Sequence, residues 1–256
     1  MLFEKPLSEG YLPNIWKTSF ITPVYKSDNR SNVKNYRPIS IMSIIPKLFE
    51  KIITKKLTYI CKNIIIEEQH GFREKRSTET NLLIIQNYLI DKIESNSQVD
   101  VIYTDFAKAF DTVSHIILLQ KLKCLGIHGI FLEWIKNYLT NRKQKVRYKS
   151  FISIDINVSS GVPQGSHLGP LLFLLFINDI IFQLLNCKFL LFADDLKIYL
   201  EIKSIEDCII FQECLDLLLE WSNANKLYFN PKKCKVMRYT KTRNIIFLII
   251  NFTIKH

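Results

Sequence analysis

The sequence predicts an α+β protein in which helices pack against antiparallel strands. The clearest observation is a pair of short apolar runs, Phe189–Phe192 and Leu196–Leu200, joined by Ala193-Asp194-Asp195. Runs this short and this rich in Phe, Leu, Ile and Tyr favour strands, so the pair predicts a hairpin. Longer stretches elsewhere repeat their apolar residues at helical spacing. With 48% hydrophobic residues, the 256-residue chain is long enough to bury a core between both kinds of element.

The basic charge of the chain points to a polyanionic partner. Lys and Arg number 35 against 24 Asp and Glu, which gives a net charge of +11. Residues 17–76 hold 13 basic and 5 acidic residues, and residues 136–149 hold 6 basic and no acidic ones. Nucleic acid and an anionic membrane surface would both suit this charge. Two basic runs on a chain that also places carboxylates at strand ends favour a nucleic-acid track.

Several kinds of segment and site are not indicated. The first ten residues lack the basic and then apolar layout of a signal peptide. The most apolar window, Leu168–Phe182, is interrupted by Pro170 and by Asn178-Asp179, too early to span a bilayer. The six cysteines form no Cys-x-x-Cys pair and the five histidines are scattered. We therefore expect reduced thiols in an intracellular protein, in nucleus or cytoplasm, and no zinc site.

The N-terminal part is expected to form a strand and then a long helix. Ile21–Tyr25 predicts a short strand and Lys26–Asn35 a polar turn, after which Pro38 biases Arg37 towards extended geometry. Pro46 suits the first turn of a helix, where a missing N–H leaves no bond unmade. The apolar face of this helix consists of Leu48, Phe49, Ile52, Ile53, Leu57 and Ile60. Its lysines lie largely off that face, which favours a core-packed helix; a membrane-surface helix is the alternative.

A helix, a buried strand and a second helix are expected next. The polar turn Gln69–Arg73 leads to Ser77 or Thr78 as the N-cap of a helix that ends before Ser95. Val99–Asp105 is a largely apolar run that finishes on an acid, as expected of a buried strand with a functional end.

The acid Asp111 has two readings. It falls at the start of a helix that is expected to run to about Cys124. Capping or interaction with the helix dipole explains an acid at that place as well as chemistry does. The remaining expected elements are helices over Phe131–Leu139 and Ile205–Asn223, strands over Gln144–Tyr148 and Ile152–Val158, and a turn and strand within Lys226–Met237.

A concentration of glycine and proline marks Ser159–Leu175. Three of the 7 Gly and two of the 8 Pro of the chain fall within ten residues here. Such a backbone must turn tightly or approach a ligand closely, and an apolar helix from Pro170 would anchor it. An ordinary strand-to-helix loop would not explain Gln164 between Pro163 and Gly165.

The paired carboxylates Asp194 and Asp195 need compensation. Adjacent carboxylates beside apolar strands repel each other and lose solvation unless a cation is present. On its own such a pair is usually a solvated acidic turn. Asp105, at the end of an earlier strand, adds a second acidic strand end and favours a shared site.

Six blocks of the sequence resemble motifs of reverse transcriptases. DFAKAFDTVSH (105–115), GVPQGSHLGPLLF (161–173) and FADD (192–195) are similar to motifs A, B and C of that family. NYRPISI, QHGFR and NPKKCKV are similar to flanking motifs of the branch found in non-LTR retrotransposons of the jockey kind. The blocks occur in the family's order and cover residues 12–239, nearly the whole chain.

The resemblance implies a right-hand polymerase fold, in which a palm with an antiparallel sheet is backed by helices and joined to fingers. It assigns 12–98 to the fingers, 99–118 to the palm with motif A, and 119–158 to a helix and hairpin returning to the fingers. Residues 159–243 would form the palm with motifs B and C and with a further motif, D, which contains Lys233. The family normally carries an endonuclease before this core and a thumb behind it. We expect 244–256 to be a truncated tail, with the thumb largely missing.

The resemblance also implies roles for single residues. The catalytic acids would be Asp105, Asp194 and Asp195, which would hold metal ions together with the carbonyl of Phe106. The nucleotide would be bound by Lys26, Arg37, Phe110, Gln164, Gly165 and Lys233. Among these, Phe110 would reject a ribose 2′-OH, Lys26 and Arg37 would contact the triphosphate, and Lys233, beside Lys232, would protonate the leaving pyrophosphate. Template and primer would meet Arg73, Gly161, Pro163 and Ser166.

The expected partners follow from the same family. They are an RNA template, a DNA primer and dNTPs, with no membrane, and the cofactors are two Mg²⁺ ions, for which Mn²⁺ can substitute. One alternative is an inactive, truncated relic that only binds nucleic acid. Another is an intron-encoded or telomerase-type enzyme, which the blocks NYRPIS and GSHLGPLLF disfavour.

Overall fold

The computed structural model describes residues 3–246. The chain divides into two compact units, each built from two separate segments. The first contains Met1–Ile64 and Phe110–Phe176, and the second contains Ile65–Ala109 and Ile177–His256. The boundaries expected from the motifs lie elsewhere, at 98/99, 118/119, 158/159 and 243/244. Residues 247–256 of the expected tail lie outside the described residues.

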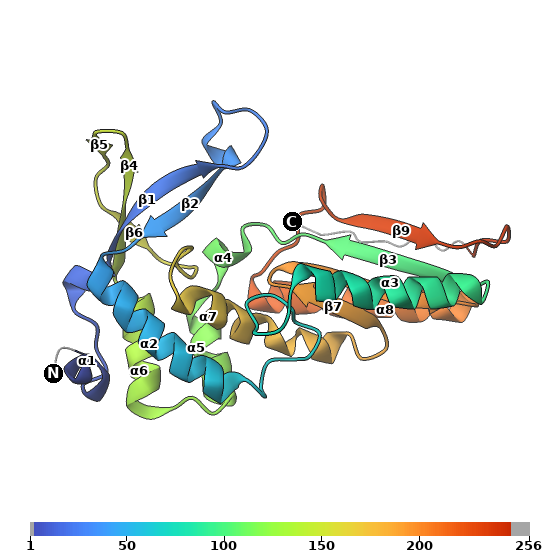
Figure 1. Cartoon of the computed structure of the whole chain (residues 1–256), viewed down its shortest axis with the longest axis horizontal. Helices are drawn as coiled ribbons and strands as arrows, with labels where there is room; N and C mark the ends of the chain where they lie inside the picture. Colours follow the sequence, from blue (N-terminus) through green and yellow to red (C-terminus); the bar gives the residue numbers. More distant parts are fainter. Residues whose placement is uncertain (1–2, 247–256) are drawn as a thin grey trace. The chain divides into compact units, whose positions relative to one another are not determined.

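The first unit contains a mixed sheet around β1 (Thr18–Tyr25). This strand pairs antiparallel with β2 (Tyr36–Ile41) and parallel with β4 (Arg142–Tyr148), as Figure 1 shows. The short strands β5 (Phe151–Ile152) and β6 (Ile156–Val158) both pair with β4. The strands β1 and β4 come from the two different segments of the unit. The chain between them therefore provides the long crossover connection that parallel neighbours need.

Aromatic side chains fill the core of the first unit. The ring of Phe49 lies 5.7 Å from the rings of Trp16 and Trp134, and Trp134 stacks on Tyr138 at 5.6 Å. The last helix of the unit, LGPLLFLLFI, is apolar on every side and its residues from Leu171 on are buried, as expected of a helix enclosed by its neighbours. The helices that begin in this unit are α1 (Glu4–Ser8), α2 (Ile44–Cys61), α5 (His115–Cys124), α6 (Gly129–Leu139) and α7 (Leu168–Ile177), with the 3₁₀ turns η1 (Asn14–Lys17) and η2 (Val33–Asn35).

The second unit contains an antiparallel sheet in the order β7-β8-β3-β9. Its strands are β7 (Lys188–Phe192), β8 (Asp195–Ile202), β3 (Gln98–Thr104) and β9 (Lys235–Tyr239). The helices α3 (Thr78–Glu94) and α8 (Ile205–Asn225) pack on this sheet, and the 3₁₀ turn η3 (Asn178–Gln183) contacts α8. Ile85 and Leu89 of α3 bury Val99 and Val101 of β3, which places β3 in the interior of the unit.

The predicted hairpin and the strand before Asp105 are confirmed. The helix from Ser77 is confirmed as well: the Ser77 hydroxyl accepts the Thr80 N–H, and Thr80 in turn accepts the Ser77 N–H. The helix predicted from Pro46 begins two residues earlier, at Ile44. Pro46 still lies in the first turn, where its missing N–H would have no partner within the helix.

Three details differ from the sequence-based expectations. Asp111 belongs to the separate short helix α4 (Ala109–Thr112) and not to the start of α5. The strand expected over Ile152–Val158 is divided into β5 and β6, and Asp155 in the gap forms ion pairs with Lys143 and Lys145. Asp195 is the first residue of β8 and pairs with Phe192, so the turn contains only Ala193 and Asp194.

Candidate active site

The sheet of the second unit brings the three expected acids to one end. Thr104, the last residue of β3, pairs with Leu196 of β8. Asp105 follows Thr104, and Asp195 precedes Leu196, so both lie one position beyond that pair at the same end of the sheet. Asp194 stands in the turn that joins β7 to β8. Antiparallel register therefore gathers carboxylates that the sequence places about ninety residues apart.

Asp105 forms an ion pair with Lys233. The Nζ atom of Lys233 lies 3.3 Å from Oδ2 and 3.5 Å from Oδ1 of Asp105. The turn that carries the lysine is itself tied to this place, because the Asn230 N–H donates to the carbonyl of Asp105 at 2.7 Å and the Lys233 N–H donates to Asn230. Both side chains remain accessible, at 30% for Asp105 and 49% for Lys233. No ion pair with Asp105 involves the neighbouring Lys232 among the described residues.

Phe106 is fixed by aromatic stacking. Its ring lies 4.3 Å from that of Phe229 and is 4% exposed. The two residues also form an antiparallel bridge, whose hydrogen bonds use the N–H of Ala107 and the carbonyl of Asp105. The backbone around Asp105 is thus held on both sides of the acid.

The donors at this end of the sheet suit a hard divalent cation in kind. Mg²⁺ takes oxygen ligands and is commonly bound by one or two carboxylates together with substrate phosphates. Within residues 3–246, no three His, Cys, Asp or Glu side chains are grouped so that they could hold an ion by themselves. A cation here would share Asp105 with Lys233, and other oxygen ligands would have to complete its coordination.

The turn before Asp194 has an unusual backbone. Ala193 adopts φ 56°, the left-handed region that a residue with a Cβ seldom occupies. It is 6% exposed, and its N–H and carbonyl both contact the side chain of Gln69. The sequence analysis placed Gln69 in a polar turn and in the block QHGFR but missed this contact, since no spacing pattern joins positions 124 residues apart.

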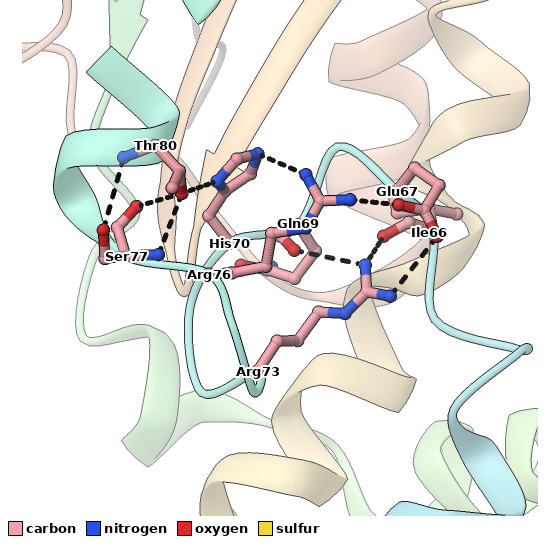
Figure 2. A network of polar contacts seen from close by, with 8 residues as sticks. All are labelled: Ile66, Glu67, Gln69, His70, Arg73, Arg76, Ser77 and Thr80. Atoms are coloured by element: carbon pink, nitrogen blue, oxygen red, sulfur yellow. Dashed lines mark hydrogen bonds and ion pairs between the residues drawn. The ribbon is translucent and has the colours of Figure 1, made fainter. Parts of the chain in front are cut away.

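A network of polar contacts holds the segment that carries Gln69 (Figure 2). The guanidinium of Arg73 donates to the carbonyls of Ile66 at 2.6 Å and Gln69 at 3.3 Å, and Arg76 forms an ion pair with Glu67. Arg73, expected to contact template or primer, therefore has its guanidinium turned to the loop itself.

The ring of His70 completes that network. It is buried between Thr80, whose Oγ1 lies 2.7 Å from Nδ1, and Arg76, whose Nη1 lies 3.4 Å from Nε2. The Thr80 hydroxyl donates to the Ser77 carbonyl, so Nδ1 of His70 donates and Nε2 accepts. Burial and then the charge of Arg76 lower the pKa of His70, which matches a neutral ring.

The first unit contains the Gly- and Pro-rich loop. The Gln164 carbonyl accepts the Ser40 N–H at 2.7 Å, and its side-chain amide donates to Oδ1 of Asp111 at 2.8 Å. Gly165 has φ +101°, and a Cβ there would lie 2.8 Å from the Ser40 carbonyl oxygen. The loop therefore lies directly on β2, and Gly165 leaves room for this close approach.

Two further residues of this loop have defined partners. A Cβ on Gly161 would lie 2.6 Å from the Asp111 carbonyl oxygen, and the Gly161 carbonyl meets Nε2 of His115 at 2.8 Å. The Ser166 hydroxyl donates to the Pro163 carbonyl and accepts the Gly169 N–H. A polar cavity of about 310 Å³ lies beside the loop, lined by Ser19, Pro38, Ser40, Asp111, Arg142, Gln144 and residues 157–164.

A buried acid that the sequence analysis missed supports the end of the same loop. Glu50 of α2 is 2% exposed, and its carboxylate accepts the His167 N–H at 3.1 Å. Burial raises the pKa of Glu50, and the charge of Arg142 partly opposes this. Arg142 is buried too and lies over the ring of Tyr138, 4.8 Å from its centroid.

The other expected nucleotide-binding residues of the first unit are two cations of its sheet region and the aromatic residue Phe110 of α4. Lys26 and Arg37 are exposed; Arg37 lies on β2 opposite Val24, and Lys26 follows β1 directly. The ring of Phe110 stacks on Phe173 at 4.4 Å.

The expected site residues are thus divided between the units. The second unit brings together Asp105, Phe106, Asp194, Asp195 and Lys233, and also contains Arg73. The first unit contains Lys26, Arg37, Phe110, Gly161, Pro163, Gln164, Gly165 and Ser166.

Comparison with known proteins gives one family. Residues 24–252 match the family model described as "Reverse transcriptase (RNA-dependent DNA polymerase)". The chain is 30% identical over 246 residues to the RNA-directed DNA polymerase from mobile element jockey of Drosophila melanogaster, covering 91% of this chain and 27% of that protein. It is 34% identical over 182 residues to a probable RNA-directed DNA polymerase from transposon X-element of the same fly, covering 70% and 20%. The chain thus spans about a fifth to a quarter of the length of these relatives.

Solved structures agree on the fold. The apo telomerase of Candida tropicalis, truncated from its C-terminal domain, superposes with a TM-score of 0.65 at 11% identity, over 90% of this chain and 51% of that one. At such low identity the likeness concerns the fold alone. No helix within residues 3–246 is long and apolar enough to cross a membrane.

Proposed function

This chain belongs to the reverse transcriptase (RNA-dependent DNA polymerase) family, and on that premise we propose that it is the polymerase core of a non-LTR mobile element. In this proposal it adds dNTPs to a DNA primer as directed by an RNA template. The observation that carries it is the antiparallel register that brings Asp105, Asp194 and Asp195 to one end of the β7-β8-β3-β9 sheet.

The proposal assigns the metal site to this end of the sheet. Asp105, Asp194 and Asp195, with the carbonyl of Phe106 and with phosphate oxygens of the substrate, would hold two Mg²⁺ ions, or Mn²⁺ in their place. When bound, such a pair lowers the pKa of an attacking hydroxyl and neutralises the reacting phosphates. Asp105 would exchange its ion pair with Lys233 for this coordination. Lys233 would then be able to donate a proton to the leaving pyrophosphate.

The first unit would select and hold the nucleotide. Lys26 and Arg37 are exposed cations that would pair with the triphosphate, where charge-assisted bonds are strong. Phe110 would exclude a ribose 2′-OH. Gln164 and Gly165 would lie against nucleotide and template, and Gly161, Pro163 and Ser166 would shape the backbone for the template strand. Arg73 would act on template or primer through the loop that it holds.

The division of the chain into fingers and palm is also part of the proposal. We assign 12–98 and 119–158 to the fingers and 99–118 and 159–243 to the palm, by motif position. The relatives are about four to five times as long as the stretch they share with this chain. Endonuclease and thumb segments are therefore expected in the full-length protein of the element, which would act inside the cell.

Primer extension tests the proposal. The chain, alone and fused to the C-terminal segment of the jockey protein, would be given poly(rA)/oligo(dT), dTTP and Mg²⁺. Asp194→Ala should lower extension more than about a hundredfold, because even outer-shell partners of a metal contribute tenfold to hundredfold. Asp216→Ala, on the exposed side of α8, is the control and should extend normally. Extension that survives Asp194→Ala would exclude the proposed site.

A protein that only binds nucleic acid is the second outcome of this test. The net charge of +11 favours it if both forms fail to extend with either metal while RNA is still retained on filters. Such retention should fall steeply with salt, because phosphate contacts release counterions.

A further inference from the structure

The turn at Ala193-Asp194 is held in a conformation that its own residues do not favour. Ala193 has φ 56°, and a side chain with a Cβ is disfavoured there. Such conformations persist when the surrounding structure over-determines them. The residue that follows is Asp194, so the backbone angles at Ala193 set the direction in which Asp194 leaves the strand.

Gln69 supplies the contacts that fix this backbone. Its Oε1 accepts the Ala193 N–H at 2.8 Å, and its Nε2 donates to the Ala193 carbonyl at 3.2 Å. The same Oε1 accepts the Gly71 N–H at 2.8 Å. One amide therefore satisfies the donor and the acceptor of Ala193 together. A carboxylate would lack the donor, and an apolar side chain would lack both.

The segment that carries Gln69 is seated firmly on β7. Gln69 is 1% exposed and forms a parallel bridge with Leu191, in which the His70 N–H donates to Leu191 at 2.8 Å and the Leu191 N–H donates to Glu68 at 2.9 Å. A Cβ on Gly71 would lie only 2.3 Å from the Ala193 nitrogen, so this loop lies directly against the turn. The contacts of Arg73 and Arg76 in Figure 2 hold the same loop.

We propose that Gln69 is a positioning residue for Asp194: its amide holds Ala193 in the left-handed conformation and so presents Asp194 to the metal site. This inference rests on the proposed function for the role of Asp194. The contact itself does not, because it concerns only the backbone of Ala193. The residue acts through the turn and touches neither substrate nor metal.

The experiment compares Gln69→Met with Gln98→Met in the full chain. Both substitutions replace a buried glutamine of the second unit by an unbranched apolar side chain. Gln98 is 3% exposed and begins β3, at the end of the strand away from Asp105, where it bonds Asp100 at 2.9 Å. Gln69→Glu is the conservative variant, since it keeps an acceptor for the Ala193 N–H and loses the donor.

Two readouts are taken without any assay of polymerisation. The first is amide hydrogen exchange at Ala193 and Asp194. We expect Gln69→Met to speed it at least tenfold, Gln69→Glu to give an intermediate rate, and Gln98→Met to leave it unchanged. The second is binding of Mn²⁺ alone, followed by electron paramagnetic resonance of the free ion. We expect Gln69→Met to weaken it at least tenfold, in the range known for outer-shell partners, and Gln98→Met to weaken it less than twofold.

The outcomes separate the two proposals. Unchanged exchange at Ala193 in both Gln69 variants would overturn the positioning role, whatever the metal does. Faster exchange with unaltered Mn²⁺ affinity would also overturn it, because the turn would then be held without consequence for Asp194. If Asp194→Ala binds Mn²⁺ as tightly as the wild type, the metal site of the proposed function fails, while the exchange rates still decide whether Gln69 holds the turn.

Discussion

Nζ of Lys233 lies 3.3 Å from Oδ2 of Asp105, although the two residues are 128 positions apart. Each is at least 30% exposed, so the pair resembles a surface salt bridge, which contributes about 0–1 kcal/mol to stability. Its consequence lies in the charge it places beside Asp105. Before any other cation arrives, Lys233 partly neutralises this acid.

Lys233→Gln should therefore tighten Mn²⁺ binding and slow extension. Loss of a competing cation worth up to about 1 kcal/mol corresponds to an increase in affinity of up to about fivefold. Extension should fall because the proposed proton donor is gone. Mn²⁺ titration and single-turnover primer extension measure the two effects separately.

Lys232→Gln is the matched control for that change. It removes the same charge from the neighbouring residue, so it should alter neither quantity by more than about twofold. Equal effects of Lys232→Gln and Lys233→Gln would mean that only the general charge of the turn matters.

Phe110→Ala should admit ribonucleotides. The ring of Phe110 is held by stacking on Phe173 at 4.4 Å, and the proposal uses its bulk against a 2′-OH. Incorporation of rNTP relative to dNTP should rise about tenfold or more, and competition between the two in primer extension measures it. Phe131→Ala removes another stacked ring of the first unit, 5.9 Å from Trp134, and should leave the ratio unchanged. An unchanged ratio in Phe110→Ala would count against a role of this ring in excluding the ribose 2′-OH.

Gly71→Ala should destabilise the second unit. Its Cβ would lie 2.3 Å from the backbone nitrogen of Ala193, which cannot move without disturbing the turn. Overpacking of this kind costs about 1–3 kcal/mol, measured as a lower free energy of unfolding in urea.

Gly126→Ala separates this clash from backbone strain. Gly126 has φ +89°, and apart from its two chain neighbours no residue of 3–246 has an atom within 4 Å of an added Cβ, so its variant should show conformational strain alone. A Gly71→Ala protein as stable as the wild type would mean that the loop does not lie against the turn.

Stability should depend on pH through Glu50. Burial raises the pKa of this acid above 4.5, so the folded chain binds its proton more tightly than the unfolded chain does. The stability that Glu50 contributes is then complete below about pH 4.5 and is lost as the pH rises through the folded pKa. Glu50→Gln should gain stability relative to the wild type across that window. Urea titrations of both proteins between pH 4 and pH 7 measure the difference.

Glu79→Gln is the control, and its effect on stability should depend on pH in the opposite direction. Hydrogen bonds from Ser77 and its own backbone lower the pKa of Glu79, so its contribution is lost as the pH falls. If the free energy of unfolding of the wild type instead rose relative to that of Glu50→Gln as the pH rises, the effect of the Arg142 charge on the pKa of Glu50 would outweigh the effect of burial.

Much of the architecture could be predicted because it depends on local pattern. The two apolar runs within Phe189–Tyr199 are too short for helices, and the structure confirms a hairpin there. Ser77 was recognisable as an N-cap because a hydroxyl that accepts the Thr80 N–H is a local device. The acids Asp105 and Asp194 could be paired because a strand that ends on an acid is also a local signal.

The rest depends on contacts that no local pattern encodes. Ala193 could not be read as left-handed, since alanine has no preference for that region and Gln69, which holds it, is 124 residues away. The division into two units could not be read either, because β1 and β4 pair across more than a hundred residues. Glu50 looked like one more charge on a basic helix, and only its burial against His167 reveals its place.

The interleaving of segments has a consequence for how the protein is made. Thr104 at the end of β3 pairs with Leu196. Leu196 is synthesised 92 residues later than Thr104. At about 5–20 residues per second, roughly 5–18 s pass before that partner is synthesised. The apolar strand Gln98–Thr104 must wait through this interval with its hydrogen-bonding edges open, so a nascent chain stalled near residue 190 should be a strong client for chaperones.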